Sequence, residues 1–166
     1  MNKKGFANII LVIVIFMLVG MIGYFTLYTP TTAPAPSPSA SLTGWQLIDA
    51  NSFTLYLPPN WKFNKLQGID SQVGEFVGDG AKLGFDYGWY SGSLAKDDDL
   101  DHIISYEIIA GYRAKVVVPK VTGNGMTGVY FNDLGNANRL SLVGNNLTAS
   151  QQEIALGIFR TLKFKK

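Results

Sequence analysis

The sequence predicts an α+β protein, with an antiparallel sheet of about seven or eight strands, a C-terminal amphipathic helix packed on one face, and one transmembrane helix before the domain. Three observations lead to this prediction. Short apolar runs separated by Gly, Pro, Asn and Asp fill most of the chain after Gly44. One segment near the C-terminus has helical periodicity, and a long uncharged apolar run stands near the N-terminus.

The N-terminal apolar run is predicted to be an uncleaved transmembrane anchor. No charged residue occurs from Ala7 to Tyr28, and about 20 apolar residues suffice to span a bilayer as a helix. Lys3 and Lys4 precede the run, so residues 1–6 are expected to be cytoplasmic and the C-terminal domain to lie outside the cytoplasmic membrane. The lipid bilayer is therefore the expected partner of residues 7–28.

Two alternatives compete for the N-terminus. A cleavable secretory signal would end in a small-x-small site such as Ala33-Pro34-Ala35, but its apolar region is usually about 7–15 residues long. Lys4-Gly5-Phe6 resembles the processing site of type IV prepilins, which implies cleavage after Gly5 and a pilin-like structural subunit. Prepilins usually carry Glu at the position of Ile10, and Pro30 would stop the long helix that they share.

Composition bounds the rest of the chain. Residues 29–43 form a linker rich in Pro, Thr, Ser and Ala, which favours extended conformations. Residues 44–166 are expected to fold as one extracytoplasmic globular domain.

The chain has no cysteine, which excludes disulfides, thiolate metal sites and cysteine nucleophiles. Lys3 and Lys4 account for the net charge of +2, so the domain is formally neutral. We expect neither a nucleic-acid partner nor a cofactor.

The apolar runs of the domain are predicted to pair as successive hairpins. Asp79-Gly80 suits a tight turn with positive φ, and Ala110-Gly111 separates another pair of runs. Pro119 is expected to end a strand, because proline cannot donate to a sheet. The predicted strands are residues 45–48, 52–57, 61–63, 73–77, 82–90, 103–109, 112–118, 126–132 and 139–143.

A single helix is predicted near the C-terminus. Thr148-Ala149-Ser150 supplies an N-cap candidate, and Glu153 three residues after Ser150 completes a possible capping box. Four apolar residues then share one face at a spacing of about 3.6 residues, which is typical of a helix that packs on a sheet. They are Ile154, Ile158, Phe159 and Leu162.

Both ends of the domain resemble the PsbP-like superfamily of small extracytoplasmic α+β domains. The resemblance rests on a Phe-rich strand followed by Leu57-Pro58-Pro59-Asn60-Trp61, and on the closing segment Ile158-Phe159-Arg160-Thr161-Leu162-Lys163-Phe164. That superfamily has no shared active site, so the resemblance implies a scaffold and not a particular chemistry.

His102 is the single histidine and follows an acidic run. A carboxylate beside an imidazole can orient a general base, but no motif supplies a nucleophile. Within that run Asp97, Asp99 and Asp101 are candidate calcium ligands, although the spacing is not that of an EF-hand and a solvated loop is the alternative.

The most unusual stretch is an aromatic strand that contains an aspartate. Alternation predicts that Tyr87 and Trp89 share one face with Phe85, while Asp86 and Tyr90 take the other. One interpretation is a ligand platform for a sugar, glycan or peptide, formed by Asp86, Tyr87, Trp89 and Tyr90 with Arg113. The other is a central strand whose rings fill the core and whose Asp86 bonds a neighbouring strand through Arg113.

The function expected from the sequence is non-enzymatic binding or assembly at the cell envelope, with an envelope protein or a glycan as partner. The alternatives are an envelope hydrolase that acts on glycan or peptide through carboxylates near Asp86 or His102, and a pilin-like subunit.

Overall fold

The structure, a computed structural model, describes residues 42–165. Within this range the chain is mainly β with a C-terminal helix, as the sequence predicts, and all strand pairs are antiparallel. The elements in chain order are β1 (Gln46–Asp49), β2 (Phe53–Leu57), β3 (Lys62–Lys65), β4 (Gln72–Gly78), β5 (Ala81–Gly88), β6 (His102–Ile109), β7 (Tyr112–Pro119), β8 (Met126–Phe131), β9 (Arg139–Asn145), α2 (Ala149–Arg160) and β10 (Lys163–Phe164).

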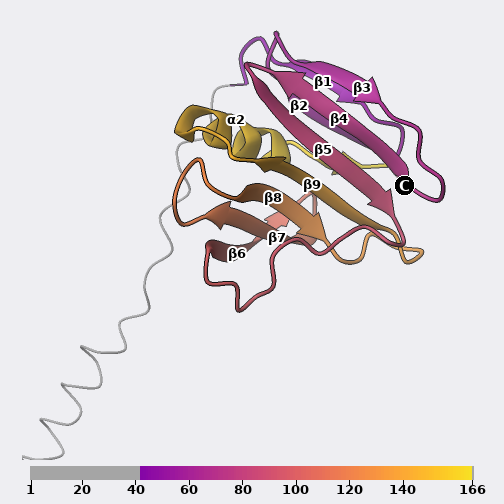
Figure 1. Cartoon of the computed structure of the whole chain (residues 1–166). Helices are drawn as coiled ribbons and strands as arrows, with labels where there is room; N and C mark the ends of the chain where they lie inside the picture. The colour runs from indigo at the N-terminus through magenta and orange to yellow at the C-terminus, as the bar shows by residue number, and fades with distance from the viewer. Residues whose placement is uncertain (1–41, 166) are drawn as a thin grey trace, which may run out of the picture. The chain divides into compact units, whose positions relative to one another are not determined.

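The strands divide between two sheets instead of forming the single predicted one. Seven of them lie in the order β3-β4-β5-β9-β8-β7-β6, and β1, β2 and β10 form a separate three-stranded sheet. Figure 1 shows β5 and β9 in the middle of the large sheet, with β3 and β6 at opposite edges. Pro58 and Pro59 separate β2 from β3, and because proline has no N–H to donate, the chain leaves one sheet there and enters the other.

The helix and the small sheet cover the same face of the large sheet. Alternate residues of β5, such as Leu83 and Phe85, are buried on this face. Phe53 of β2 meets the ring of Phe85 edge-on, with centroids 5.1 Å apart, and α2 packs against both β8 and β2. Ala155, Ile158 and Phe159 are the buried residues of the helix. One continuous apolar core therefore joins the helix and the two sheets.

The opposite face of the large sheet is partly covered by residues 89–101, which we call the crossing loop. Ser91 bonds Ser141 of β9 at 3.0 Å between their hydroxyl oxygens, and the Nζ of Lys115 on β7 donates to the carbonyl of Ala95. Gly128 of β8 leaves room for the loop, because a Cβ there would lie 2.8 Å from a methyl carbon of Leu94. The sheet is thus packed on both faces over its central strands.

Several local predictions are confirmed and two need correction. The Asp79-Gly80 turn has positive φ at both residues, and β7 ends at Pro119. Thr148, the first residue of the candidate N-cap segment, is the N-cap. The reciprocal capping box is formed by its hydroxyl and the Gln151 side chain, two residues earlier than the predicted pair Ser150 and Glu153. Strand β5 ends at Gly88, so Trp89 and Tyr90 do not continue it.

No helix within residues 42–165 is both long and apolar enough to cross a membrane. The predicted transmembrane helix at residues 7–28, and the linker as far as residue 41, lie outside the described residues.

Candidate functional site

An open groove of about 790 Å³ lies where the start of β4 and the end of β5 meet two loops. One loop joins β1 to β2 and the other joins β3 to β4. The lining residues are Asn51, Ser52, Lys65, Leu66, Gln67, Gly68, Ile69, Asp70, Ser71, Gln72, Tyr87, Gly88, Trp89, Tyr90 and Asn138.

Aromatic rings form one wall of this groove. Tyr87 is half-buried at the end of β5, whereas Trp89 and Tyr90 are 60% and 74% exposed. Since β5 ends at Gly88, the two exposed rings leave the strand alternation, and all three rings line the same hollow. The indole N–H of Trp89 donates to the carbonyl of Asn136 at 3.1 Å, which orients this exposed ring.

Close packing holds the loop between β3 and β4 against the end of β5. A Cβ at Gly88 would lie 2.7 Å from the Cβ of Ser71, so only glycine lets the loop before β4 approach the end of β5 this closely. Ile69 on this loop is fully exposed beside the groove. The sequence signal for this contact is Gly88, but the sequence does not show that Gly88 is needed for contact with the loop that contains Ser71.

Hydrogen bonds of Gln72 tie together two segments that line the groove. The Ser52 hydroxyl donates to Oε1 of Gln72 at 2.8 Å, and the Gln72 amide nitrogen donates to the carbonyl of Ala50. Gln72 thereby ties the β1–β2 turn to β4. Sequence reasoning missed Gln72 and Asn138, because amide side chains in turns and at strand ends are common and carry no motif.

The groove is nearly neutral. Of the described residues that line it, Lys65 is the one basic side chain and Asp70 the one acidic side chain. Burial raises the pKa of the Tyr87 phenol, so its hydroxyl stays protonated at neutral pH. Aromatic faces beside amide and hydroxyl groups suit a neutral ligand that offers both apolar surface and hydroxyl groups.

Asp86 and Arg113 are separate from this groove and from each other. Asp86 pairs with Val73 and Ser141 across the sheet, and its Oδ1 is buried with no hydrogen-bond partner among the described residues. Arg113 stacks over the ring of Tyr106 at 4.0 Å from the ring centroid. The predicted bond between Asp86 and Arg113 is therefore not formed, and of the five predicted ligand residues the structure brings together Tyr87, Trp89 and Tyr90.

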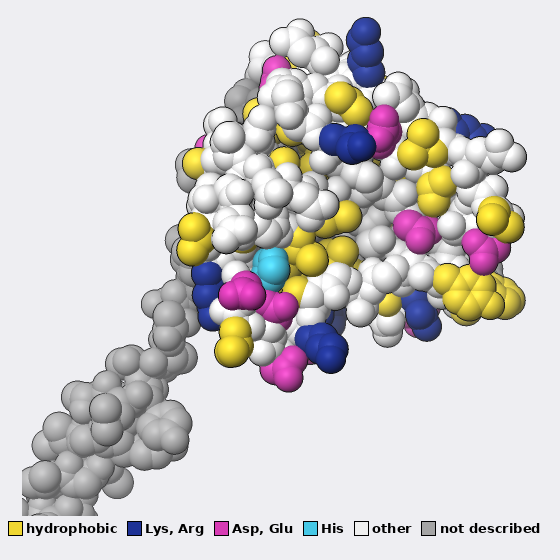
Figure 2. Space-filling view, in the orientation of Figure 1, with side chains coloured by type: hydrophobic (Ala, Val, Ile, Leu, Met, Phe, Trp, Pro, Cys, Tyr) yellow, Lys and Arg dark blue, Asp and Glu magenta, His cyan; other side chains and the backbone are white. Residues whose placement is uncertain are grey.

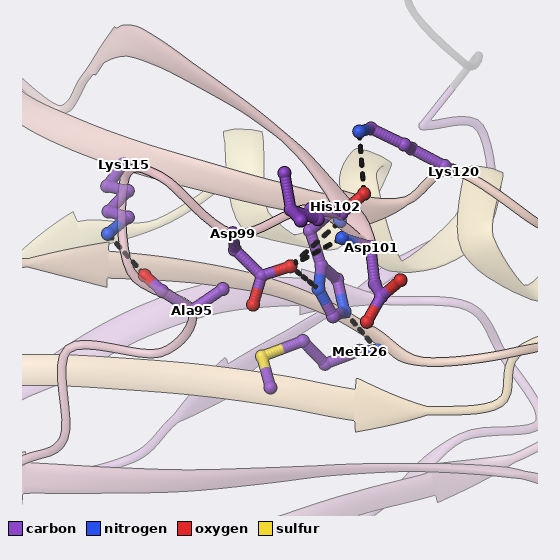
Figure 3. A network of polar contacts seen from close by, with 8 residues as sticks. Ala95, Asp99, Asp101, His102, Lys115, Lys120 and Met126 are labelled. Carbon is purple, nitrogen blue, oxygen red and sulfur yellow. Dashed lines mark hydrogen bonds and ion pairs between the residues drawn. The ribbon is translucent and has the colours of Figure 1, made fainter.

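The acidic run is organised by bonds to different partners. Asp97 accepts from Nζ of Lys115 at 2.7 Å and from the hydroxyl of Tyr106 at 3.0 Å. These bonds, first the one from Lys115, lower the pKa of the Asp97 carboxyl. Asp99 turns instead toward His102, and its Oδ1 also accepts the backbone N–H of Asp101 (Figure 3).

The structure does not bring Asp97, Asp99 and Asp101 together as cation ligands. Within residues 42–165, no group of three or more His, Cys, Asp or Glu side chains is placed to hold a metal ion. The acidic run instead anchors the end of the crossing loop to β6 and β7.

Both ring nitrogens of His102 are occupied. Nδ1 lies 2.8 Å from Oδ1 of Asp99, and Nε2 accepts the backbone N–H of Met126 at 3.1 Å (Figure 3). Nδ1 therefore carries the proton, since Nε2 must accept. Figure 2 shows the histidine beside acidic and hydrophobic side chains. A general base needs a free ring nitrogen that faces a substrate, and this imidazole offers none in this arrangement.

Comparison of the chain with protein-family models, with curated proteins and with solved structures found no match. The geometry of the groove and its surroundings is thus the basis for the function proposed below.

Proposed function

We propose that this chain is a single-pass membrane-anchored protein whose extracytoplasmic domain binds an uncharged glycan of the cell envelope without transforming it. The observation that carries the proposal is the pair of exposed rings, Trp89 and Tyr90, on a groove lined with amide and hydroxyl groups. Large exposed aromatic side chains are enriched at recognition surfaces because they offer much contact area and lose little conformational entropy.

The anchor part of the proposal is supported by the sequence. Residues 7–28 are uncharged and apolar, Lys3 and Lys4 precede them, and a Pro-rich segment follows. A short tether keeps the domain close to the membrane surface, where envelope polymers lie. The resemblance of the domain's two ends to PsbP-like domains is part of the same proposal and concerns the scaffold.

Binding is favoured over hydrolysis by the distribution of carboxylates. Glycoside hydrolysis usually requires two carboxyl groups that flank the scissile bond, and Asp70 is the single acidic residue among the described groove residues. Asp86 does not line the groove, and both ring nitrogens of His102 are engaged elsewhere.

Ligand binding can be tested with the full-length chain in detergent micelles. The probes are two neutral oligosaccharides, the N-acetylglucosamine tetramer and cellotetraose, titrated by calorimetry and by tryptophan fluorescence. We expect at least one to bind, and Trp89→Ala and Tyr90→Ala each to weaken it about tenfold, which corresponds to about 1.4 kcal/mol. The control is Leu100→Ala, which removes an exposed apolar side chain outside the groove.

Two results would overturn the binding proposal: the absence of binding by both neutral probes, or unchanged affinity in both aromatic variants. Release of shorter sugars during the titration would favour the hydrolase alternative instead.

The topology needs a separate experiment. A C-terminally tagged chain is expressed, and protease is added to intact cells or spheroplasts. Loss of the tag from a membrane-bound species of full-length mass supports the outward-facing domain. A protected tag contradicts this topology, and an intact mass that begins at Phe6 supports the pilin-like alternative.

A further inference from the structure

Strand β6 is a long and unprotected edge of the large sheet. It runs for eight residues from His102 to Ile109 and pairs with β7 on one side only. Proteins usually protect such edges with lysine, proline, a bulge or a very short strand. The opposite edge, β3, has four residues and begins and ends with lysine, whereas β6 contains neither lysine nor proline.

The hydrogen-bond register identifies which backbone groups of β6 point away from the sheet. Ala110 and Gly111 both have positive φ and form the two-residue turn, so Ile109 and Tyr112 are a hydrogen-bonded pair. From this pair onward, hydrogen-bonded and non-hydrogen-bonded pairs alternate along β6 and β7. At its far end His102 lies opposite Pro119, which has no N–H, and the His102 N–H turns outward to Asp99 at 3.0 Å.

Three residues therefore present free backbone groups at this edge. By the same alternation, Ile104, Tyr106 and Ile108 direct both their N–H and C=O groups outward. Within residues 42–165, no hydrogen bond engages these groups. Asp99 ends this free segment by capping His102, so the unpaired edge runs from Ile104 to Ile108.

The side chains along the free edge are mostly apolar. Ile108 is 73% exposed and Tyr106 is 46% exposed, on the face that carries the crossing loop. Glu107 is the one charged residue between Ile104 and Ile108, and it is held on the other face by Arg160 at 2.8 Å. An exposed apolar edge of this length is a template for an added strand.

We propose that β6 pairs antiparallel with β6 of a second copy of this chain, around a two-fold axis at Tyr106. In this register Tyr106 lies opposite Tyr106 of the second copy, and Ile104 lies opposite Ile108 of the second copy. Every residue whose backbone N–H and C=O groups point away from the sheet then lies opposite another such residue. The pairing joins two seven-stranded sheets into one continuous sheet.

The edge itself argues for a second copy as the occupant. The three outward residues are symmetric about Tyr106, so self-pairing satisfies all the free N–H and C=O groups on both chains. Isoleucine meets isoleucine and tyrosine meets tyrosine, which are favourable cross-strand pairs. Glu107 lies opposite Ser105 of the second copy, so no like charges face each other.

Disulfide trapping tests the register, because the natural chain has no cysteine. Tyr106→Cys places two thiols directly across the axis, where Cα atoms of a hydrogen-bonded pair are about 5.5 Å apart, within disulfide range. The matched control is Ser105→Cys on the next residue, whose diagonal separation of about 7–8 Å exceeds that range. Oxidation is carried out on the full-length chain in membranes and read on non-reducing gels.

Solution mass tests the same pairing without a cross-link. The full-length chain in detergent micelles is expected to have the mass of a dimer. Tyr106→Lys places two ammonium groups opposite each other and is expected to give a monomer. Tyr106→Phe keeps the ring and is expected to remain a dimer. Circular dichroism and thermal unfolding of each variant establish that it is folded.

The expected result is efficient cross-linking of Tyr106→Cys, little of Ser105→Cys, and loss of the dimer in folded Tyr106→Lys. Equal cross-linking at both positions would overturn the register. A monomeric wild-type chain without cross-linking at Tyr106→Cys would overturn self-pairing.

Discussion

One carboxylate oxygen, Oδ1 of Asp99, accepts hydrogen bonds from both the ring and the backbone of His102, at 2.8 and 3.0 Å. The other ring nitrogen of His102 accepts the N–H of Met126, at the start of β8. The imidazole therefore links the end of the crossing loop to β8, and the residue expected as a candidate base has a structural role here.

The first prediction concerns this link. His102→Ala leaves the Met126 N–H without its partner and removes the ring's bond to the Asp99 carboxylate, which keeps its two backbone donors. The imidazole is largely buried, with 10% of its side chain exposed. We expect a loss of about 1–3 kcal/mol in the free energy of unfolding. Urea denaturation measures it, with Asp98→Asn, a change at an exposed position of the same loop, as the control. Equal midpoints for the two variants would contradict the structural role.

The second prediction concerns pH. The hydrogen bond from the His102 side chain is the main cause that lowers the pKa of the Asp99 carboxyl below its ordinary value. A lowered folded-state pKa stabilises the fold above the unfolded-state pKa, and this stabilisation is lost as pH falls through the folded-state value. We expect the urea midpoint of the wild type to fall between pH 5 and about pH 3 more steeply than that of Asp99→Asn. Parallel pH profiles would disagree with this assignment.

A third prediction concerns the crossing loop. Lys115 is nearly buried beneath the loop and bonds both the Ala95 carbonyl and Asp97. Lys115→Met keeps the apolar stem and removes both bonds, so trypsin should cut after Lys96 on the order of tenfold faster, since a bond to a charged group contributes about 1.5–3 kcal/mol. Mass spectrometry follows the cleavage.

The matched control for the loop is Lys82→Met, an exposed lysine whose nearest carboxylate oxygen, on Glu75, is 3.5 Å away. Cleavage after Lys96 at the wild-type rate in Lys115→Met would show that this lysine does not hold the loop.

The fourth prediction compares two glycines in neighbouring strands. A Cβ at Gly78 would lie 2.4 Å from the indole of Trp61, whereas a Cβ at Gly84 would meet nothing within 4 Å. Because Trp61 is 1% exposed, Gly78→Ala should cost about 1–3 kcal/mol of stability. Gly84→Ala should change stability by less than about 0.5 kcal/mol. Urea unfolding followed by tryptophan fluorescence measures both, and similar costs would refute the packing argument.

Much of the strand pattern was predictable because its signals are local. The turn at Asp79-Gly80 and the end of β7 at Pro119 follow from backbone preferences of the residues themselves. The capping box is predicted at Ser150 and Glu153 but forms at Thr148 and Gln151, because Thr148 and Ser150 both carry a hydroxyl and only the observed bonds distinguish them.

The candidate site was predictable only in part, because its parts come from distant segments. The sequence indicates Tyr87, Trp89 and Tyr90 as aromatic neighbours, but strand alternation predicts Tyr90 on the opposite face. This prediction is wrong because β5 ends at Gly88, where the loop that contains Ser71 packs closely. The partner of Arg113 could not be predicted either, because Tyr106 reaches it through the register of β6 and β7.

The sequence by itself determined the β-rich class of the domain, its hairpins, its C-terminal helix, and the absence of cysteine chemistry, because these depend on composition and on residues close together in the chain. Only the tertiary structure decided that the strands divide into two sheets, that the aromatic rings line one groove, that His102 links two elements, and that β6 has a free edge. The physical reason is that these features depend on which distant backbone groups find hydrogen-bond partners and which side chains share space, and neither is encoded in any short segment.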